Sequence, residues 1–104
     1  MTQTISYAQQ ELELYFTNEE WLVRPCTIAI GKAHRQRETF DYERALKFLQ
    51  RRMIDAAKQY TREHGSMTDS WQRLFPLADR KAAAESVLQS MLAEFKLGNY
   101  WTAK

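Results

Sequence analysis

Apolar residues recur every three or four positions between residues 39 and 65, which is the pattern of an amphipathic helix. At 3.6 residues per turn, the stretch predicts a helix of about six or seven turns. Thr39 or Asp41 can cap its start, and Gly65 can end it in a left-handed conformation. We expect one buried face, made of Tyr42, Ala45, Leu46, Leu49, Met53, Ala56, Ala57 and Tyr60.

The opposite face of this helix is basic, with cations that again recur at intervals of three and four positions, apart from one gap. They are Arg44, Lys47, Arg51, Lys58 and Arg62, and Asp55 fills the gap. One interpretation is a solvated face on which Asp55 pairs with Arg51 and Lys58. The alternatives are a surface for an acidic protein and a surface that follows nucleic-acid phosphates.

Residues 4–16 fit two structures. Ile5, Ala8, Leu12 and Tyr15 would share a helical face, with Thr4 or Ser6 as cap. Alternation of Leu12, Leu14 and Phe16 with polar neighbours would suit a half-buried strand. The run from Ala8 to Glu11 is poor strand material, so the helix is favoured.

The next segment is also ambiguous. Residues 17–20 have the form of a capping box ahead of Trp21, and Pro25 is expected to end that turn and open another helix. Cys26, Ala29, Ile30 and Ala33 then lie at helical spacing. Residues 21–30 are nevertheless rich in β-branched side chains, so a hairpin within residues 11–30 remains as the alternative.

Two further helices are expected after Gly65. A capping box at residues 69–72 predicts a short helix that ends before Pro76 and directs Trp71, Leu74 and Phe75 at the core. The last helix should run from Leu77 or Asp79 to Leu97, with Gly98 as its stop. Its apolar face would comprise Leu77, Ala84, Leu88, Met91, Leu92 and Phe95.

These elements predict one domain, residues 1–104, of the all-α class. We expect a small bundle of about four helices in which the long central helix and the last helix form an antiparallel pair. The alternative class is α+β, with the N-terminal hairpin in residues 11–30. Only three glycines and two prolines occur in 104 residues, which favours helices over the many tight turns of an all-β fold.

Charge is distributed unevenly, although the net charge is only +2. Residues 1–23 carry four glutamates and no Lys or Arg, whereas residues 24–37 carry Arg24, Lys32, Arg35 and Arg37 and no acid. This contrast indicates that the two segments pack near each other or face different partners.

No motif for catalysis, metal or cofactor binding is recognisable. His34 and His64 are far apart in the sequence, Cys26 is the single cysteine, and Gly31-Lys32 lacks the rest of a phosphate-binding loop. A nucleophilic pair of Cys26 with either histidine is the one catalytic alternative. We therefore expect a protein that is not an enzyme and binds no cofactor.

The aromatic residues suggest binding, because Trp, Tyr and Arg dominate interaction hot spots. Several of them lie at the edges of the expected helices, and Tyr100 and Trp101 follow the last one. That last pair either folds back on the bundle or anchors a partner.

The favoured function is a non-catalytic protein-interaction module: a helical adaptor, small subunit or inhibitor that binds a larger protein, including the type that phages and mobile elements direct at host machinery. The partner-binding residues would be Arg44, Lys47, Arg51, Lys58, Arg62, Tyr100 and Trp101. The alternative is a nucleic-acid-binding regulator that uses the basic face. The absence of an apolar leader or span predicts a cytoplasmic protein with no membrane partner, and the sequence leaves the oligomeric state open.

Overall fold

Helices account for all the regular structure in the described part of the chain. The computed structural model describes residues 6–35 and 41–97, with side-chain environments for 6–32 and 41–94. Its elements are α1 (Tyr7–Asn18), α2 (Glu20–Arg35), α3 (Tyr42–His64), α4 (Trp71–Leu74) and α5 (Leu77–Leu97). The predicted all-α class is therefore confirmed. The alternative hairpin in residues 11–30 is wrong, because α1 and α2 occupy that range.

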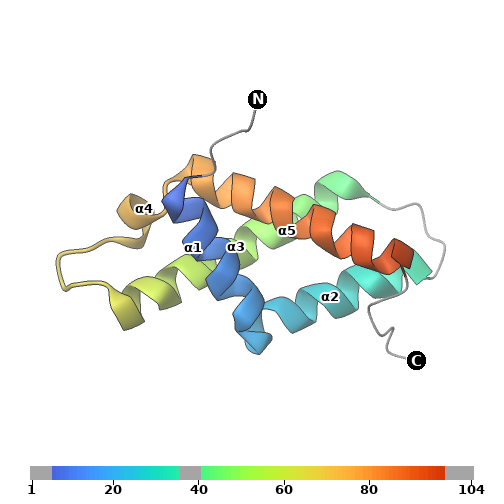
Figure 1. Ribbon diagram of the computed structural model, residues 1–104, viewed down its shortest axis with the longest axis horizontal. Coiled ribbons are helices and arrows are strands. Elements are labelled where there is room, and N and C mark those ends of the chain that lie inside the picture. Colours follow the sequence, from blue (N-terminus) through green and yellow to red (C-terminus); the bar gives the residue numbers. More distant parts are fainter. Residues whose placement is uncertain (1–5, 36–40, 98–104) are drawn as a thin grey trace.

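The two longest helices, α3 and α5, form the centre of the fold, where they run in opposite directions and cross (Figure 1). Their mutual contact is the most extensive between any two of the described helices, and that of α1 with α5 comes next. From the end of α1, α2 extends away from the crossing, and it packs against both α1 and α3. The predicted antiparallel pair of helices is present.

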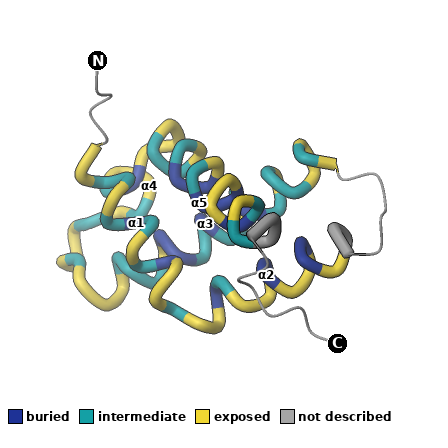
Figure 2. The backbone as a smooth tube through the Cα atoms, turned by 45° about the vertical axis from the view of Figure 1, so that its right-hand side comes forward, coloured by how far each residue is buried: buried dark blue, intermediate teal, exposed yellow. Residues whose placement is uncertain are grey.

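The core is built from the inner faces of these helices, which Figure 2 shows as buried stripes along the chain. Both central helices contribute small residues to the core, because Ala56 and Ala57 of α3 and Ala83 and Ala84 of α5 are fully buried. Small side chains allow two helix axes to approach closely. The larger buried side chains around them are Leu12, Phe16, Leu22, Ile30, Leu49, Met53, Phe75, Val87, Leu88 and Met91.

The first helix buries the positions of a helical face rather than those of a strand. Leu12 and Phe16, four residues apart, are fully buried, whereas Leu14 is 58% exposed. Ser6 caps α1 by accepting a hydrogen bond from the backbone N–H of Gln9 (3.0 Å), and its hydroxyl donates to Asp79 of α5. The start of α1 is thereby fixed to the start of α5.

A single residue, Glu19, joins α1 to α2. Its N–H donates to the carbonyl of Tyr15 (3.1 Å), and its own carbonyl accepts from the N–H groups of Leu22 and Val23 (3.0 and 3.1 Å). The predicted capping box is wrong, because Thr17 lies in the last turn of α1 and donates its hydroxyl to the carbonyl of Glu13 (2.9 Å). The two helices therefore meet without a loop.

Pro25 lies inside α2, so the prediction that it ends a turn is wrong. A proline has no N–H for the carbonyl four residues earlier, and an interior proline destabilises a helix by about 3 kcal/mol or more. In this fold the carbonyl concerned, that of Trp21, accepts a hydrogen bond from Nη2 of Arg52 in α3 (3.0 Å). A donor from a neighbouring helix thus replaces the missing one.

Both ends of α3 lie where the sequence predicts them, but the backbone conformation at Gly65 differs from the prediction. Asp41 is the N-cap and accepts from the N–H of Arg44 (3.1 Å). Gly65 ends the helix, but in an extended conformation (φ −87°, ψ 168°), so the predicted left-handed geometry is wrong. A Cβ at this position would lie 2.7 Å from the carbonyl oxygen of Thr61, and this lack of space explains the glycine.

Two predictions for the segment from the end of α3 to the start of α5 are also wrong. The N-cap of α4 is Ser70, which accepts from the N–H of Arg73 (3.2 Å), whereas Asp69 accepts from the N–H of Ser66 (2.7 Å). Phe75 is buried as predicted, but Leu77, expected on the buried face of α5, is 54% exposed. None of the described helices is long and apolar enough to cross a membrane.

Candidate interaction surface between α3 and α5

The basic face predicted for α3 is present on the surface. All five of its cations are exposed: Arg44, Lys47, Arg51, Lys58 and Arg62. Asp55 forms its ion pair with Arg52 (3.5 Å), so the predicted pairs with Arg51 and Lys58 are wrong. The five exposed cations fit a solvated face as well as an interaction surface, and Asp55 forms no ion pair with Arg51 or Lys58.

Part of this face borders a groove of about 270 Å³ between α3 and the first turns of α5. We call it the basic groove, and its lining residues are Lys47, Gln50, Arg51, Ile54, Leu77, Arg80 and Lys81. Four of these seven side chains are cationic and none is a carboxylate. Arg80 and Lys81 were not among the binding residues predicted from the sequence, because their proximity to α3 depends on how the two helices cross.

Trp71 of α4 connects the basic groove to the rest of the basic face. Nζ of Lys58 lies 5.4 Å from the centroid of its ring, and the guanidinium carbon of Arg80 lies 4.9 Å from it. Arg80 also donates from Nε to the carbonyl of Phe75 (2.9 Å). Cation–π contacts of this kind contribute about 0.5–1 kcal/mol at exposed sites. Arg80 is therefore held in place beside the groove.

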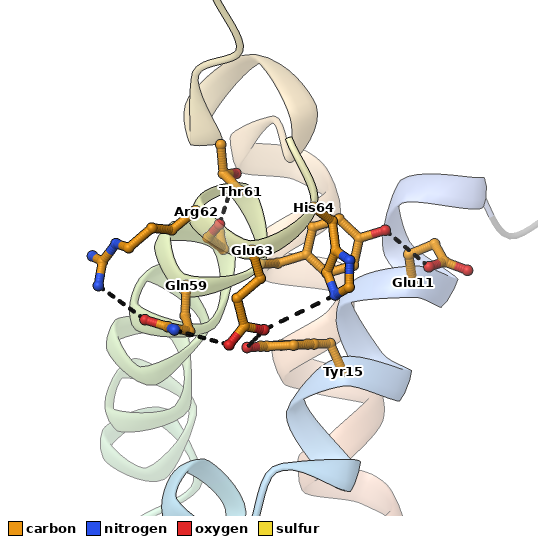
Figure 3. A network of polar contacts seen from close by, with 9 residues as sticks. Glu11, Tyr15, Gln59, Thr61, Arg62, Glu63 and His64 are labelled. Atoms are coloured by element: carbon orange, nitrogen blue, oxygen red, sulfur yellow. Dashed lines mark hydrogen bonds and ion pairs between the residues drawn. The ribbon is translucent and has the colours of Figure 1, made fainter. Parts of the chain in front are cut away.

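A second cluster of polar side chains lies where α1 meets the end of α3 (Figure 3). The hydroxyl of Tyr15 donates to Oε1 of Glu63 (2.7 Å), and Nε2 of Gln59 donates to Oε2 of the same carboxylate (3.0 Å). Nearby, the hydroxyl of Tyr60 donates to Oε2 of Glu11 (3.2 Å), and the rings of Tyr15 and Tyr60 meet edge to face at 5.4 Å. These contacts connect α1 to α3.

The titration of this cluster suits a structural role. The hydrogen bonds from Gln59 and Tyr15 hold the pKa of Glu63 below its ordinary value. Burial and the neighbouring carboxylates raise the pKa of both phenols, Tyr15 and Tyr60, above their usual value. At neutral pH the Glu63 carboxylate is thus an ionised acceptor and the two phenols are protonated donors.

Cys26 is placed for packing. Its side chain is fully buried, its Sγ lies 3.6 Å from the carbonyl oxygen of Leu22, and burial raises its pKa to about 11, although Arg52 acts in the opposite direction. The thiol is therefore protonated and screened from solvent at neutral pH. His64 lies in the tyrosine cluster, where its Nε2 is 3.9 Å from Oε1 of Glu63, and the side chain of His34 falls outside the described residues.

Two other expectations, the partner anchor and the absence of a metal site, stay predictions. Tyr100 and Trp101 lie beyond the last described residue, so their role as a partner anchor stays a prediction. Over the described ranges 6–32 and 41–94, no group of three or more His, Cys, Asp or Glu side chains could hold a metal ion.

Comparisons with known proteins identify no relative of this chain. No protein-family model matches the chain, and neither the curated proteins nor the solved structures include a match. Functional inference therefore depends on the geometry of the surfaces.

Proposed function

We propose that this protein is a non-catalytic interaction module that binds an acidic surface of a larger protein through the basic groove. The observation that supports the proposal is the lining of the groove, where Lys47, Arg51, Arg80 and Lys81 stand around a small space without a carboxylate. Like charges held close together repel one another, and carboxylates from a partner would relieve that repulsion.

The apolar part of the groove narrows the class of partner. Ile54 lies on its wall, and Leu77 is 54% exposed at its edge. Trp71, in contact with two cations, is adjacent. Arginine and tryptophan are enriched among the residues that dominate protein–protein binding energy. A segment that combines carboxylates with an apolar side chain would complement this lining.

The limited length of the basic surface supports a protein partner over nucleic acid. Glu43 stands one turn before Lys47 on α3, and Glu85 one turn after Lys81 on α5, and all four side chains are exposed. Residues four apart on a helix are neighbours, so an acid bounds the groove along each helix. Duplex binding draws its affinity from cations that contact many phosphates in succession, and each of these two carboxylates stands at one end of the groove.

A binding titration with defined probes tests the proposal. The probes are a fluorescent peptide of alternating Glu and Leu, poly-glutamate of the same length, and a short DNA duplex, each measured at several salt concentrations. We expect the mixed acidic–apolar peptide to bind most tightly. Tighter binding of the duplex, with a steep salt dependence, would instead establish the nucleic-acid alternative.

Two charge-matched double variants locate the binding site. Arg51→Gln with Lys81→Gln removes two groove cations and should weaken peptide binding by about tenfold or more, which corresponds to about 1.4 kcal/mol. Arg44→Gln with Arg62→Gln removes two cations of α3 outside the groove and should leave the affinity almost unchanged. Equal losses in the two variants would show that only net charge matters. Neither pair should alter stability appreciably, because exposed charges contribute little to folding.

A further inference from the structure

Arg80 differs from the other three cations of the basic groove in how firmly it is held. The other three are exposed, whereas Arg80 is half-buried. Its guanidinium carbon lies 4.9 Å from the centroid of the Trp71 ring, and its Nε donates to the carbonyl of Phe75 (2.9 Å). Phe75 itself is buried, so its carbonyl is a stationary acceptor. These two contacts fix the position of the guanidinium before any partner binds.

The fixed guanidinium keeps most of its hydrogen-bonding capacity. Arginine has five N–H donors, and the carbonyl of Phe75 uses the one at Nε. Within the described ranges, neither Nη1 nor Nη2 of Arg80 has a hydrogen-bond acceptor, and the side chain forms no ion pair there. A carboxylate that pairs side-on with a guanidinium needs Nε, so that approach is closed. The end-on approach, in which each carboxylate oxygen accepts from one Nη group, stays open.

The neighbours of Arg80 determine what lies beside such a carboxylate. Leu77, three residues earlier on α5, is 54% exposed, and residues three apart on a helix are neighbours. Ile54 of α3 lines the same groove. A carboxylate bound at Arg80 would therefore lie next to an apolar contact within one small space, which suits an acidic residue with an apolar residue close to it.

We propose that Arg80 is the primary carboxylate-binding residue of the basic groove, which pairs end-on with one carboxylate of the partner, and that Trp71 is the positioning residue that holds it. This inference rests on the proposed binding of an acidic segment in the groove. A side chain that is already fixed loses little conformational freedom on binding, whereas an exposed Lys or Arg must first be ordered. Arg80 therefore contributes more to the affinity than the other three cations.

Conservative substitutions separate the guanidinium fork from the charge. Arg80→Lys keeps the positive charge but lacks the planar fork, so it should weaken binding of the Glu–Leu peptide by about tenfold or more. Arg51→Lys is the matched comparison, the same change at an exposed cation of the groove, and should weaken binding by about threefold. Equal losses would overturn the role of Arg80 and leave the proposed function intact. A wild-type chain that does not bind the peptide would overturn both.

A double-mutant cycle tests the role of Trp71. Trp71→Leu removes the ring but keeps apolar bulk, and it should weaken peptide binding by about fivefold in the wild-type background. In the Arg80→Lys background the same change should have little effect, because the fork that the ring holds is already absent. Trp71→Phe keeps an aromatic face and should retain most of the wild-type affinity. Equal losses in the two backgrounds would overturn the positioning role.

NMR of the arginine side chains supplies a measurement that a purely structural role would not change. The Nη signals of Arg80 are assigned by their absence from the spectrum of Arg80→Lys. They should shift and sharpen with saturating peptide, because a two-point pair slows rotation about the Cζ–Nη bonds. Nη signals that do not respond would overturn the end-on pairing. Unfolding midpoints above the temperature of the titration establish that each variant is folded when its affinity is measured.

Discussion

At the scale of single residues, Arg52 compensates for Pro25. The guanidinium of Arg52 donates to the Trp21 carbonyl that Pro25 leaves without an intrahelical donor, and it also pairs with Asp55 of its own helix. Among the described residues, its buried Nε has no hydrogen-bond acceptor. Arg52 thus stabilises α2 at some cost to its own hydrogen bonding.

A double-mutant cycle measures this compensation. Pro25→Ala restores an N–H that can donate to the Trp21 carbonyl, and it should raise the free energy of unfolding by about 1–3 kcal/mol. Arg52→Met should then destabilise the Pro25→Ala protein less than the wild type, with a coupling of about 1 kcal/mol in urea unfolding. Pro76→Ala, at a proline that precedes α5, is the control and should combine additively with Arg52→Met. Additivity in the Pro25→Ala background would show that Arg52 does not compensate for the proline.

At the scale of helices, the contact of α1 with α3 depends on groups that titrate at opposite ends of the pH scale. Glu63 accepts from Tyr15, and its lowered pKa means that its contribution to stability is complete above the pKa of the unfolded carboxyl and is lost as the pH falls. The pKa of Tyr15 is raised, so its contribution is complete below the pKa of an unfolded phenol and is lost as the pH rises through the higher folded value.

The variant Tyr15→Phe tests this contact. At neutral pH it should lower the free energy of unfolding by about 0.5–1.5 kcal/mol, the net value of one hydrogen bond. Thermal unfolding from about pH 2 to pH 11 should show the difference from wild type shrinking below about pH 4 and above about pH 10. Tyr7→Phe is the control, because Tyr7 is 75% exposed, and it should show no such dependence. A constant difference across the range would mean that Tyr15 acts through packing alone.

At the scale of the whole molecule, stability comes from the crossing of α3 and α5 with α1 packed on it. Leu49 and Leu88 are fully buried in the shared core, one from each central helix.

Truncation of the core leucines tests this account of stability. Leu49→Ala or Leu88→Ala should each cost about 2–5 kcal/mol, because each leaves a cavity in a packed interior. For a domain of this size, each kcal/mol lowers the unfolding midpoint by roughly 4–8 °C. Leu77→Ala is the control at an exposed leucine and should change stability by about 0.5 kcal/mol or less. A comparable loss in Leu77→Ala would place part of the core elsewhere.

The sequence predicts the parts of this fold that depend on local periodicity. The buried face of α3, the bounds of α5 and the cap at Asp41 follow from spacing and side-chain type within one helix. The continuity of α2 through Pro25 could not be predicted, because the replacement donor, Arg52, lies in another helix. Of the four cations in the basic groove, only Lys47 and Arg51 were predicted from the sequence. Arg80 and Lys81 were not, because tertiary packing brings them next to α3.

The one-residue joint at Glu19 makes the chain length critical at that point. A helix turns by about 100° for each residue, so an inserted residue that lengthens either helix would rotate Leu12 and Leu22 out of register with each other. The connection between α3 and α4 contrasts with this joint, because Met67 there is completely exposed, and longer loops cost little additional closure entropy. We therefore expect an inserted tag to be tolerated near Met67 and to disrupt the fold at Glu19.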